Sequence, residues 1–94
     1  MNVLISDEDT GTRQLIARVL EHKFGVEVEE APNGLDALDR LQQKPFGALI
    51  MEARMPVMDG LETLQVLRES PQFSRLPVMI VTSERDERLI KLLI

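Results

Sequence analysis

Acidic and hydroxyl side chains directly follow three short apolar segments of this 94-residue sequence. In chain order they are Asp7, Glu8, Asp9, Glu52, Thr82 and Ser83. If the apolar segments are parallel strands, the side chains after their carboxyl ends converge on one pocket. Only oxygen ligands are available there, which favours a hard cation such as magnesium or calcium. Because neighbouring carboxylates repel one another, we expect a positive group to compensate for them.

The first acidic segment, residues 7–9, also permits interpretations other than a metal site. Asp9 stands where a helix N-cap belongs, and its carboxylate needs no other purpose there. A calcium loop beginning at Asp7 needs glycine at its sixth position and glutamate at its twelfth. Thr12 and Arg18 occupy these positions, which excludes that motif. Haloacid-dehalogenase-type phosphatases carry Asp-x-Asp-x-Thr, but Gly11 replaces the threonine and that family needs a longer chain.

The composition is that of an ordinary globular domain and argues against several functional classes. Hydrophobic residues make up 44% and charged residues 29% of the chain, which is typical. The net charge of −5, without a block of basic residues, argues against direct nucleic-acid binding. The sequence has no cysteine, and no apolar stretch approaches the ~20 residues that cross a membrane. We therefore expect one cytoplasmic domain, residues 1–94, without disulfides, thiolate metal sites or a membrane anchor.

Short apolar runs alternate with stretches of helical periodicity. The apolar runs predict strands over residues 3–5, 26–31, 48–51 and 78–81. Apolar residues at helical spacing predict helices over residues 15–24, 35–41, 61–67 and 89–93. Such an alternation requires right-handed crossovers and gives an α/β fold, a parallel sheet with helices on both faces. Gly25 should end the first helix, and glutamates within residues 26–31 indicate a strand near the sheet edge.

Four segments, in the right order and spacing, resemble the receiver domains of two-component response regulators. They are residues 3–9 with Arg13, residues 31–38, residues 55–60 (Met-Pro-Val-Met-Asp-Gly) and residues 77–83. The loop at residues 55–60 is the most specific of them. The resemblance implies a flavodoxin-like, doubly wound parallel sheet with strand order 2-1-3-4. It also implies (βα)4 of the family's usual (βα)5.

The resemblance assigns one group of residues to a magnesium site. Asp7 and Glu8 correspond to the family's acidic pair, with Glu8 the closer to the metal. Glu52 occupies the position of the phospho-accepting aspartate. The backbone carbonyl of Arg54 stands where a carbonyl oxygen completes the metal shell. We expect magnesium to bind weakly, because the longer glutamate side chains distort the site.

The resemblance assigns a second group of residues to the phosphorylation switch. Thr82 would donate a hydrogen bond to the phosphoryl group, and the small Ser83 keeps access to it open. In the family, a histidine kinase supplies the phosphoryl group, and phosphorylation rearranges the surface around the fourth helix and fifth strand. Glutamate at position 52 predicts impaired phosphorylation or partial mimicry of the phosphorylated state.

Two further functional classes compete with the receiver hypothesis. A pseudo-receiver would bind partner proteins through the same surface without any phosphate. A metal-dependent hydrolase is disfavoured, because no general base or water-activating histidine is present; His22, the single histidine, is expected on a helix surface. We therefore expect a signalling protein, not an enzyme.

The family's fifth strand, its lysine and its fifth helix have no counterpart before Ile94. The last predicted helix runs up to the end of the sequence without a capping signal, so we expect a fragment of a longer receiver rather than a degenerate one. Without the fifth unit, part of the apolar stripe of residues 15–20 and the edge of the strand at residues 78–81 lack cover. We therefore expect self-association through that edge or through residues 89–94.

Overall fold

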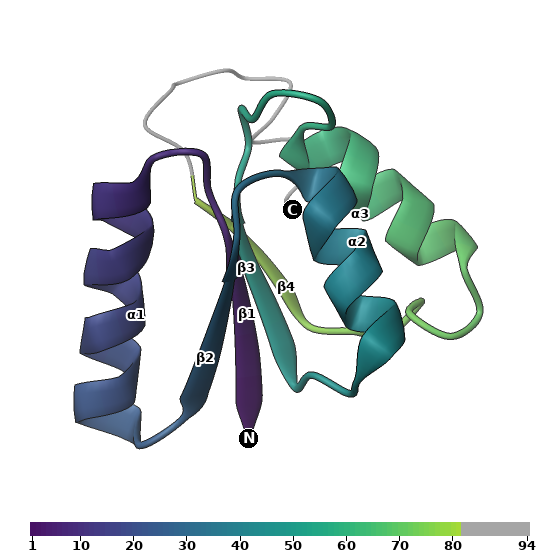
Figure 1. The fold of residues 1–94 in the computed structure, drawn as a ribbon. Helices are drawn as coiled ribbons and strands as arrows, with labels where there is room; N and C mark the ends of the chain where they lie inside the picture. Colours follow the sequence, from purple (N-terminus) through teal and green to yellow (C-terminus); the bar gives the residue numbers. More distant parts are fainter. Residues whose placement is uncertain (82–94) are drawn as a thin grey trace.

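The computed structural model describes residues 1–81, which form a four-stranded parallel sheet with helices on both faces (Figure 1). The elements in chain order are β1 (Asn2–Ser6), α1 (Thr10–Phe24), β2 (Glu27–Ala31), α2 (Gly34–Gln43), β3 (Ala48–Glu52), α3 (Gly60–Glu69) and β4 (Val78–Val81). The strand order is β2-β1-β3-β4, so the predicted fold class is confirmed. The helix expected at residues 89–93, and with it Thr82 and Ser83, lies outside the described residues.

β1 lies at the centre of the sheet and fixes the alignment of its neighbours. Ser6, its last residue, is the register partner of Ala31 in β2 and of Met51 in β3. All pairings are parallel, so the strands end at the same edge of the sheet. β4 continues the arrangement, because Val81 pairs with Glu52 at the end of β3.

The sheet separates two apolar clusters of unequal size. The larger cluster lies on the face covered by α2 and α3, and its buried members are Leu4, Ala31, Ala37, Leu41, Leu49, Met51, Ala53, Met55, Leu67 and Ile80. The smaller cluster lies under α1 and consists of Val3, Ile5 and Ala17, with half-buried neighbours around them. Consecutive residues of β1 therefore serve opposite faces, as the two-residue period of a strand requires.

Local capping sets the ends of α1. The helix begins at Thr10, earlier than the predicted start at residue 15, because the Asp9 side chain accepts a hydrogen bond from the Thr12 amide and caps the first turn. Gly25 ends the helix with a φ of 64°, a left-handed conformation that glycine adopts without a side-chain penalty. Both the capping role of Asp9 and the stop at Gly25 are confirmed.

Only part of the apolar stripe of α1 is packed against the sheet. Ile16 and Leu20 contact the smaller cluster, whereas Leu15 and Val19 are 64% and 44% exposed. Met79 is the register partner of Ile50 and therefore shares this face of the sheet. Exposed apolar residues on this side include Leu15, Val19, Met79 and Val81. They are consistent with the expected self-association, which stays a prediction.

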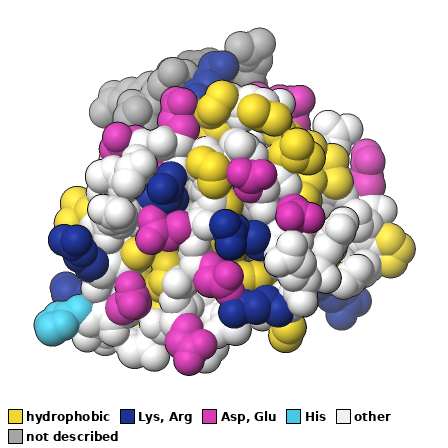
Figure 2. All heavy atoms as spheres, in the orientation of Figure 1, with side chains coloured by type: hydrophobic (Ala, Val, Ile, Leu, Met, Phe, Trp, Pro, Cys, Tyr) yellow, Lys and Arg dark blue, Asp and Glu magenta, His cyan; other side chains and the backbone are white. Residues whose placement is uncertain are grey.

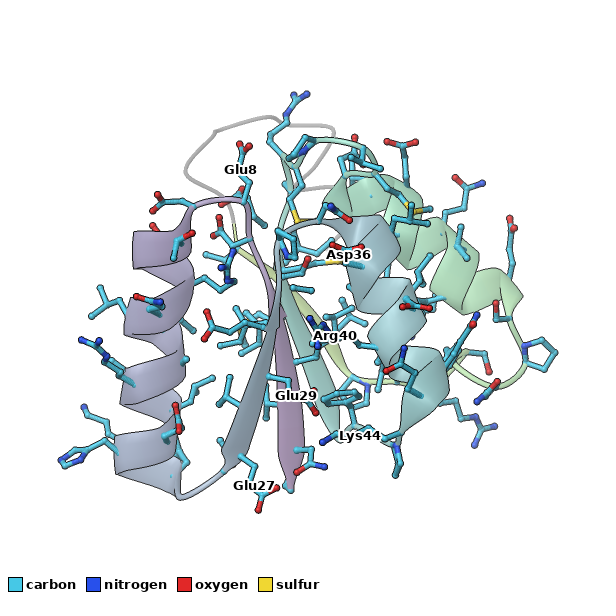
Figure 3. The ribbon with its side chains drawn as sticks, viewed as in Figure 1. Glu8, Glu27, Glu29, Asp36, Arg40 and Lys44 are labelled. Carbon is cyan, nitrogen blue, oxygen red and sulfur yellow. The ribbon has the colours of Figure 1, made fainter. Side chains whose placement is uncertain are left out.

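Charged side chains attach the edge strand β2 to α2. Glu29 of β2 forms ion pairs with Arg40, at 3.7 Å, and with Lys44. Figure 3 shows Arg40 on α2 and Lys44 directly after the helix, both near the glutamate. β2 is the outer strand on this side, so the predicted edge position of the glutamate-rich strand is confirmed.

The start of α2 is packed tightly against the segment that precedes α3. The Gly34 amide donates a hydrogen bond of 3.0 Å to the Met58 carbonyl oxygen. A Cβ atom on Gly34 would lie 1.9 Å from the Thr63 hydroxyl oxygen and 2.6 Å from that same carbonyl oxygen. Position 34 therefore needs glycine because a side chain would not fit there. Its backbone φ is not in the left-handed region, so backbone conformation is not the reason.

We predict that Gly34→Ala lowers the free energy of unfolding by about 1–3 kcal/mol, because the added methyl group must displace backbone atoms. Gly11→Ala is the matched control. Its Cβ would meet nothing nearer than 3.8 Å, and alanine favours the helix, so stability should be unchanged or raised. Urea unfolding followed by far-ultraviolet circular dichroism measures both changes. Equal effects of the two substitutions would show that the packing at Gly34 is not restrictive.

Candidate functional site

The carboxyl edge of the sheet brings Asp7 and Glu52 to adjacent strands. Their neighbours Ser6 and Met51 are register partners, so the two acidic residues occupy equivalent positions where β1 and β3 end. The Asp7 amide continues the ladder by donating to the Ala31 carbonyl oxygen at 3.1 Å. The predicted adjacency of the strand ends is therefore correct.

The two members of the acidic pair have different environments. Asp7 is buried, with 7% of its surface exposed. Its carboxylate accepts a hydrogen bond of 2.9 Å from the Asp9 amide, an Asx-turn that shapes the loop into α1. Glu8 is exposed, and Figure 3 shows it on the loop above the sheet, with its carboxylate directed outward.

The Glu52 side chain folds back onto its own backbone. Its carboxylate accepts a hydrogen bond of 2.9 Å from the amide of Ala53. The same amide lies 3.3 Å from the Val81 carbonyl oxygen, so it serves two acceptors. A half-buried carboxylate that follows a strand end can satisfy itself in this way because glutamate has the length to reach back.

The expected convergence of three or four carboxylates on one pocket stays a prediction, because residues 1–81 contain only part of the proposed site. No group of three or more His, Cys, Asp or Glu residues lies close enough there to hold a metal ion. The cause is local: Asp7 and Glu52 accept hydrogen bonds from nearby amides, and Glu8 is exposed. Arg54 lies in the loop after β3 with an exposed side chain.

Arg13 supplies the positive charge that the acidic segment was expected to need. Its guanidinium donates to the Asp7 carbonyl oxygen at 2.6 Å and to the Glu30 carboxylate at 2.9 Å. The side chain is only 14% exposed, so this ion pair is shielded from water more than a typical surface pair. From the sequence, Arg13 was assigned only through the family resemblance, because no sequence pattern signals a contact with Glu30, 17 residues away.

A buried hydroxyl at the end of β1 connects the loops around the site. The Ser6 side chain is fully buried and lies 2.9 Å from the Asn33 carbonyl oxygen and 3.2 Å from the Met55 sulfur. Asn33 in turn caps α2 by accepting from the Asp36 amide at 2.8 Å. Ser6 therefore links the β2–α2 turn to the β3–α3 loop. It directly precedes Asp7 and is the register partner of Met51, which precedes Glu52.

The Met-Pro-Val-Met-Asp-Gly segment has a structural role beside Glu52. Asp59 and Glu62 form a capping box that starts α3. Gly60 donates to the Ala53 carbonyl oxygen at 3.0 Å, and a Cβ there would lie 2.5 Å from the Glu52 carbonyl oxygen. Within the segment, Val57 has a φ of 68°, a strained conformation for a β-branched residue. The motif thus places the start of α3 directly against the acceptor position.

Comparison with known proteins identifies the family. The profile of the response regulator receiver domain matches residues 3–94. The chain belongs to this family. It is 34% identical over 83 residues to response regulator Rre1 of Synechocystis, covering 88% of this chain and 36% of Rre1. It is 33% identical over 85 residues to the transcriptional regulatory protein CpxR homolog of Haemophilus influenzae, covering 90% of this chain and 35% of that protein.

The solved structures of receiver domains agree with the fold described here. The Vibrio cholerae chemotaxis protein CheY4 superposes with a TM-score of 0.87 at 31% identity, covering 96% of this chain and 74% of that one. By contrast, the chain spans only about a third of the length of Rre1 and of the CpxR homolog. The comparisons therefore concern the receiver part of these proteins, a domain of two-component signalling.

Receiver domains generally bind Mg²⁺ in an acidic pocket, and the residues at this edge of the sheet offer the oxygen ligands that Mg²⁺ prefers. Asp7, Glu8 and Glu52 offer carboxylate oxygens, and Arg54 offers a backbone carbonyl oxygen two residues after Glu52. Oxygen donors of this kind suit a hard cation. The backbone positions of Asp7 and Glu52 are adjacent, but their carboxylates accept hydrogen bonds from amides. An ion therefore has to compete with those amides for the oxygen atoms.

The surface gives no sign of a large basic patch on the face shown in Figure 2, where acidic and basic side chains are interspersed. This distribution agrees with the net charge of −5 and with the lack of a block of basic residues in the sequence. Among the helices of residues 1–81, none is long and apolar enough to cross a membrane.

We predict that Thr12→Val raises the pKa of Asp9. The Thr12 hydroxyl and then the Thr12 amide hold the pKa of Asp9 below its ordinary value by hydrogen bonds to the carboxylate, assisted by the Arg13 charge. Valine removes the hydroxyl but keeps the amide, so the pKa should rise part of the way. Carboxyl carbon shifts measured by NMR across a pH titration report this change.

The pKa of Asp9 is lower in the folded chain, so its contribution to stability is present above the unfolded pKa and lost as the pH falls through the folded value. Thr12→Val should therefore weaken the loss of stability in acid. Thr10→Val is the control, because Thr10 contacts Arg13 and not the Asp9 carboxylate. An unchanged pKa in Thr12→Val, or the same rise in both variants, would contradict the assignment.

Proposed function

We propose that this domain receives signals without efficient phosphorylation, because Glu52 stands at the acceptor position. The observation that supports this most directly is the hydrogen bond between the Glu52 carboxylate and the Ala53 amide. A carboxylate that is turned back on the strand end is not directed at an incoming phosphoryl group. We infer that the chain acts as a signalling switch and not as an enzyme.

The extra methylene of glutamate has a direct kinetic consequence. It moves the carboxylate by roughly 1 Å, and a misplacement of that order can cost about a hundredfold in rate. When it is released from the Ala53 amide, the longer side chain would also carry its charge towards the position that phosphoryl oxygens would occupy. Glu52 would then imitate the phosphorylated state in part, because a carboxylate has about one charge where a phosphoryl group has nearly two.

Thr82 and Ser83 complete the proposed switch. Val81 is the register partner of Glu52, and Thr82 is the next residue in the sequence. We propose that the Thr82 hydroxyl donates to the Glu52 carboxylate as it would to a phosphoryl group, and that the small Ser83 leaves this position accessible. The switch would bias the domain towards its active surface without a kinase.

The partners that we propose are a histidine kinase or another signalling protein in the cytoplasm. Receiver domains typically interact with such proteins, and the mixed charges of the surface in Figure 2 suit protein contacts better than nucleic acid. A second copy of the chain is a further proposed partner, through the exposed apolar residues beside α1 and β4.

We predict that the chain is not phosphorylated by acetyl phosphate at position 52. In a chain extended through a fifth strand and helix, Glu52→Asp should become phosphorylated there, because the shorter side chain no longer reaches its own Ala53 amide as easily. Intact-mass and peptide mass spectrometry detect the added phosphoryl group and its position. Glu62→Asp is the matched control, since Glu62 belongs to the α3 capping box, and it should remain unlabelled.

The results separate the receiver from a pseudo-receiver, which binds partners without phosphate. Labelling of Glu52 itself would contradict impaired phosphorylation. Labelling of Glu52→Asp alone supports a receiver that is altered at one residue. If Glu52→Asp is not labelled in the extended chain either, the switch is lost and the pseudo-receiver is the better description.

We predict weak magnesium binding by Asp7, Glu8, Glu52 and the Arg54 carbonyl. Millimolar Mg²⁺ should shift the amide NMR signals of residues 7–9 and 52–54, because binding replaces hydrogen bonds of the carboxylates. Glu8→Gln should reduce these shifts. The control Glu21→Gln, on the exposed surface of α1, should not. If millimolar magnesium shifts neither segment, the domain has no metal site at this edge.

A further inference from the structure

A second concave site lies at the amino end of β4, away from Asp7 and Glu52. A groove of about 770 Å³ is formed there by two chain segments. One is residues 41–46, which end α2 and lead into β3, and the other is residues 71–77, which lead from α3 into β4. We call this the amino-end groove. None of the residues assigned to the phosphorylation switch lines it.

One arginine orders the wall formed by residues 71–77. The Arg68 guanidinium donates from the same nitrogen to the carbonyl oxygens of Phe73, Ser74 and Leu76, at 3.2, 3.3 and 2.8 Å. Backbone hydrogen bonds from Phe73 to Ser70 and from Leu76 to Phe73 fold the segment into consecutive turns. The wall is therefore organised before any ligand arrives, which reduces the entropic cost of binding.

The groove combines an apolar floor with positive charge. Phe46, Phe73 and Leu76 are half-buried and pack against the larger core cluster, so each also presents surface to the groove. Lys44 lies 5.6 Å from the centre of the Phe46 ring. Two of the chain's three aromatic residues thus line this one site.

The charge at the groove has the opposite sign to that of the whole chain. Lys44 and Arg75 are the charged residues among those that line it, and no lining residue is acidic, although the chain has a net charge of −5. Lys44 is paired with Glu29. Arg75 is exposed and forms no ion pair within residues 1–81. An anionic partner can therefore bind Arg75 without displacing an internal carboxylate.

We propose that the amino-end groove binds an acidic peptide segment of a partner protein, with one bulky apolar side chain placed on Phe46 and Phe73. Aromatic floors and arginine are typical of the positions that dominate protein interfaces. A peptide is favoured over a small organic acid because the cations line a groove open between two surface turns. Small-molecule sites instead enclose most of their ligand.

The test is an NMR titration of the isotope-labelled 94-residue chain with an acetylated peptide of sequence Asp-Asp-Leu-Phe-Asp-Asp. Saturable shifts are expected in residues 41–46 and 71–77. Arg75→Glu should weaken binding about tenfold or more, because it places like charges opposite each other. Arg18→Glu is the matched control, an equal change of charge on exposed α1, and should alter the affinity by less than about twofold.

Two further ligands test which kind of molecule the amino-end groove binds. The peptide with lysine in place of each aspartate should bind at least about tenfold more weakly, because its charges oppose Lys44 and Arg75. Phenylacetate should bind far more weakly than the acidic peptide. The proposal is overturned if the shifts fall outside the two segments, if Arg18→Glu weakens binding as much as Arg75→Glu, or if the lysine peptide or phenylacetate binds as tightly.

Discussion

The parallel pairing of β1 with both of its neighbours is the constraint on which the site depends. It places the residues after Ser6 and Met51 side by side, and Ser6 then joins the two loops above them through a buried hydroxyl. Because side chains alternate along a strand, a shift of one residue in this register would exchange the two faces. Leu4 would then face α1, and Val3 and Ile5 would face the larger cluster. The core and the site are therefore fixed by the same alignment.

Much of the fold could be predicted because it depends on patterns that the sequence displays directly. Unbroken apolar runs marked the buried strands, and the start of α1 after Asp9 and its stop at Gly25 follow from local backbone chemistry. The exposure of Leu15 could not be predicted from such sequence patterns. Helical spacing shows that apolar residues share a face, but not how far the neighbouring strands extend beneath them.

The candidate site was predictable in its position and not in its side-chain arrangement. Sequence order located Asp7 and Glu52 at neighbouring strand ends. It could not show that the Glu52 carboxylate takes the Ala53 amide as its partner, because this outcome depends on a competition among nearby donors. Arg13 was underestimated for a related reason: its contact with Glu30 crosses from α1 to β2. Such a contact has no periodic signature, and only the folded chain reveals it.

The glutamates of β2 have a consequence for how copies of the chain meet. Strands in a sheet lie about 4.8 Å apart, so an in-register second β2 added to this edge would stack each glutamate on its own copy. Glu27, Glu29 and Glu30 would each face a like charge. Glu29 is held by Arg40 and Lys44, so it cannot turn away without breaking ion pairs. This margin of the sheet is therefore protected against fibre-like growth.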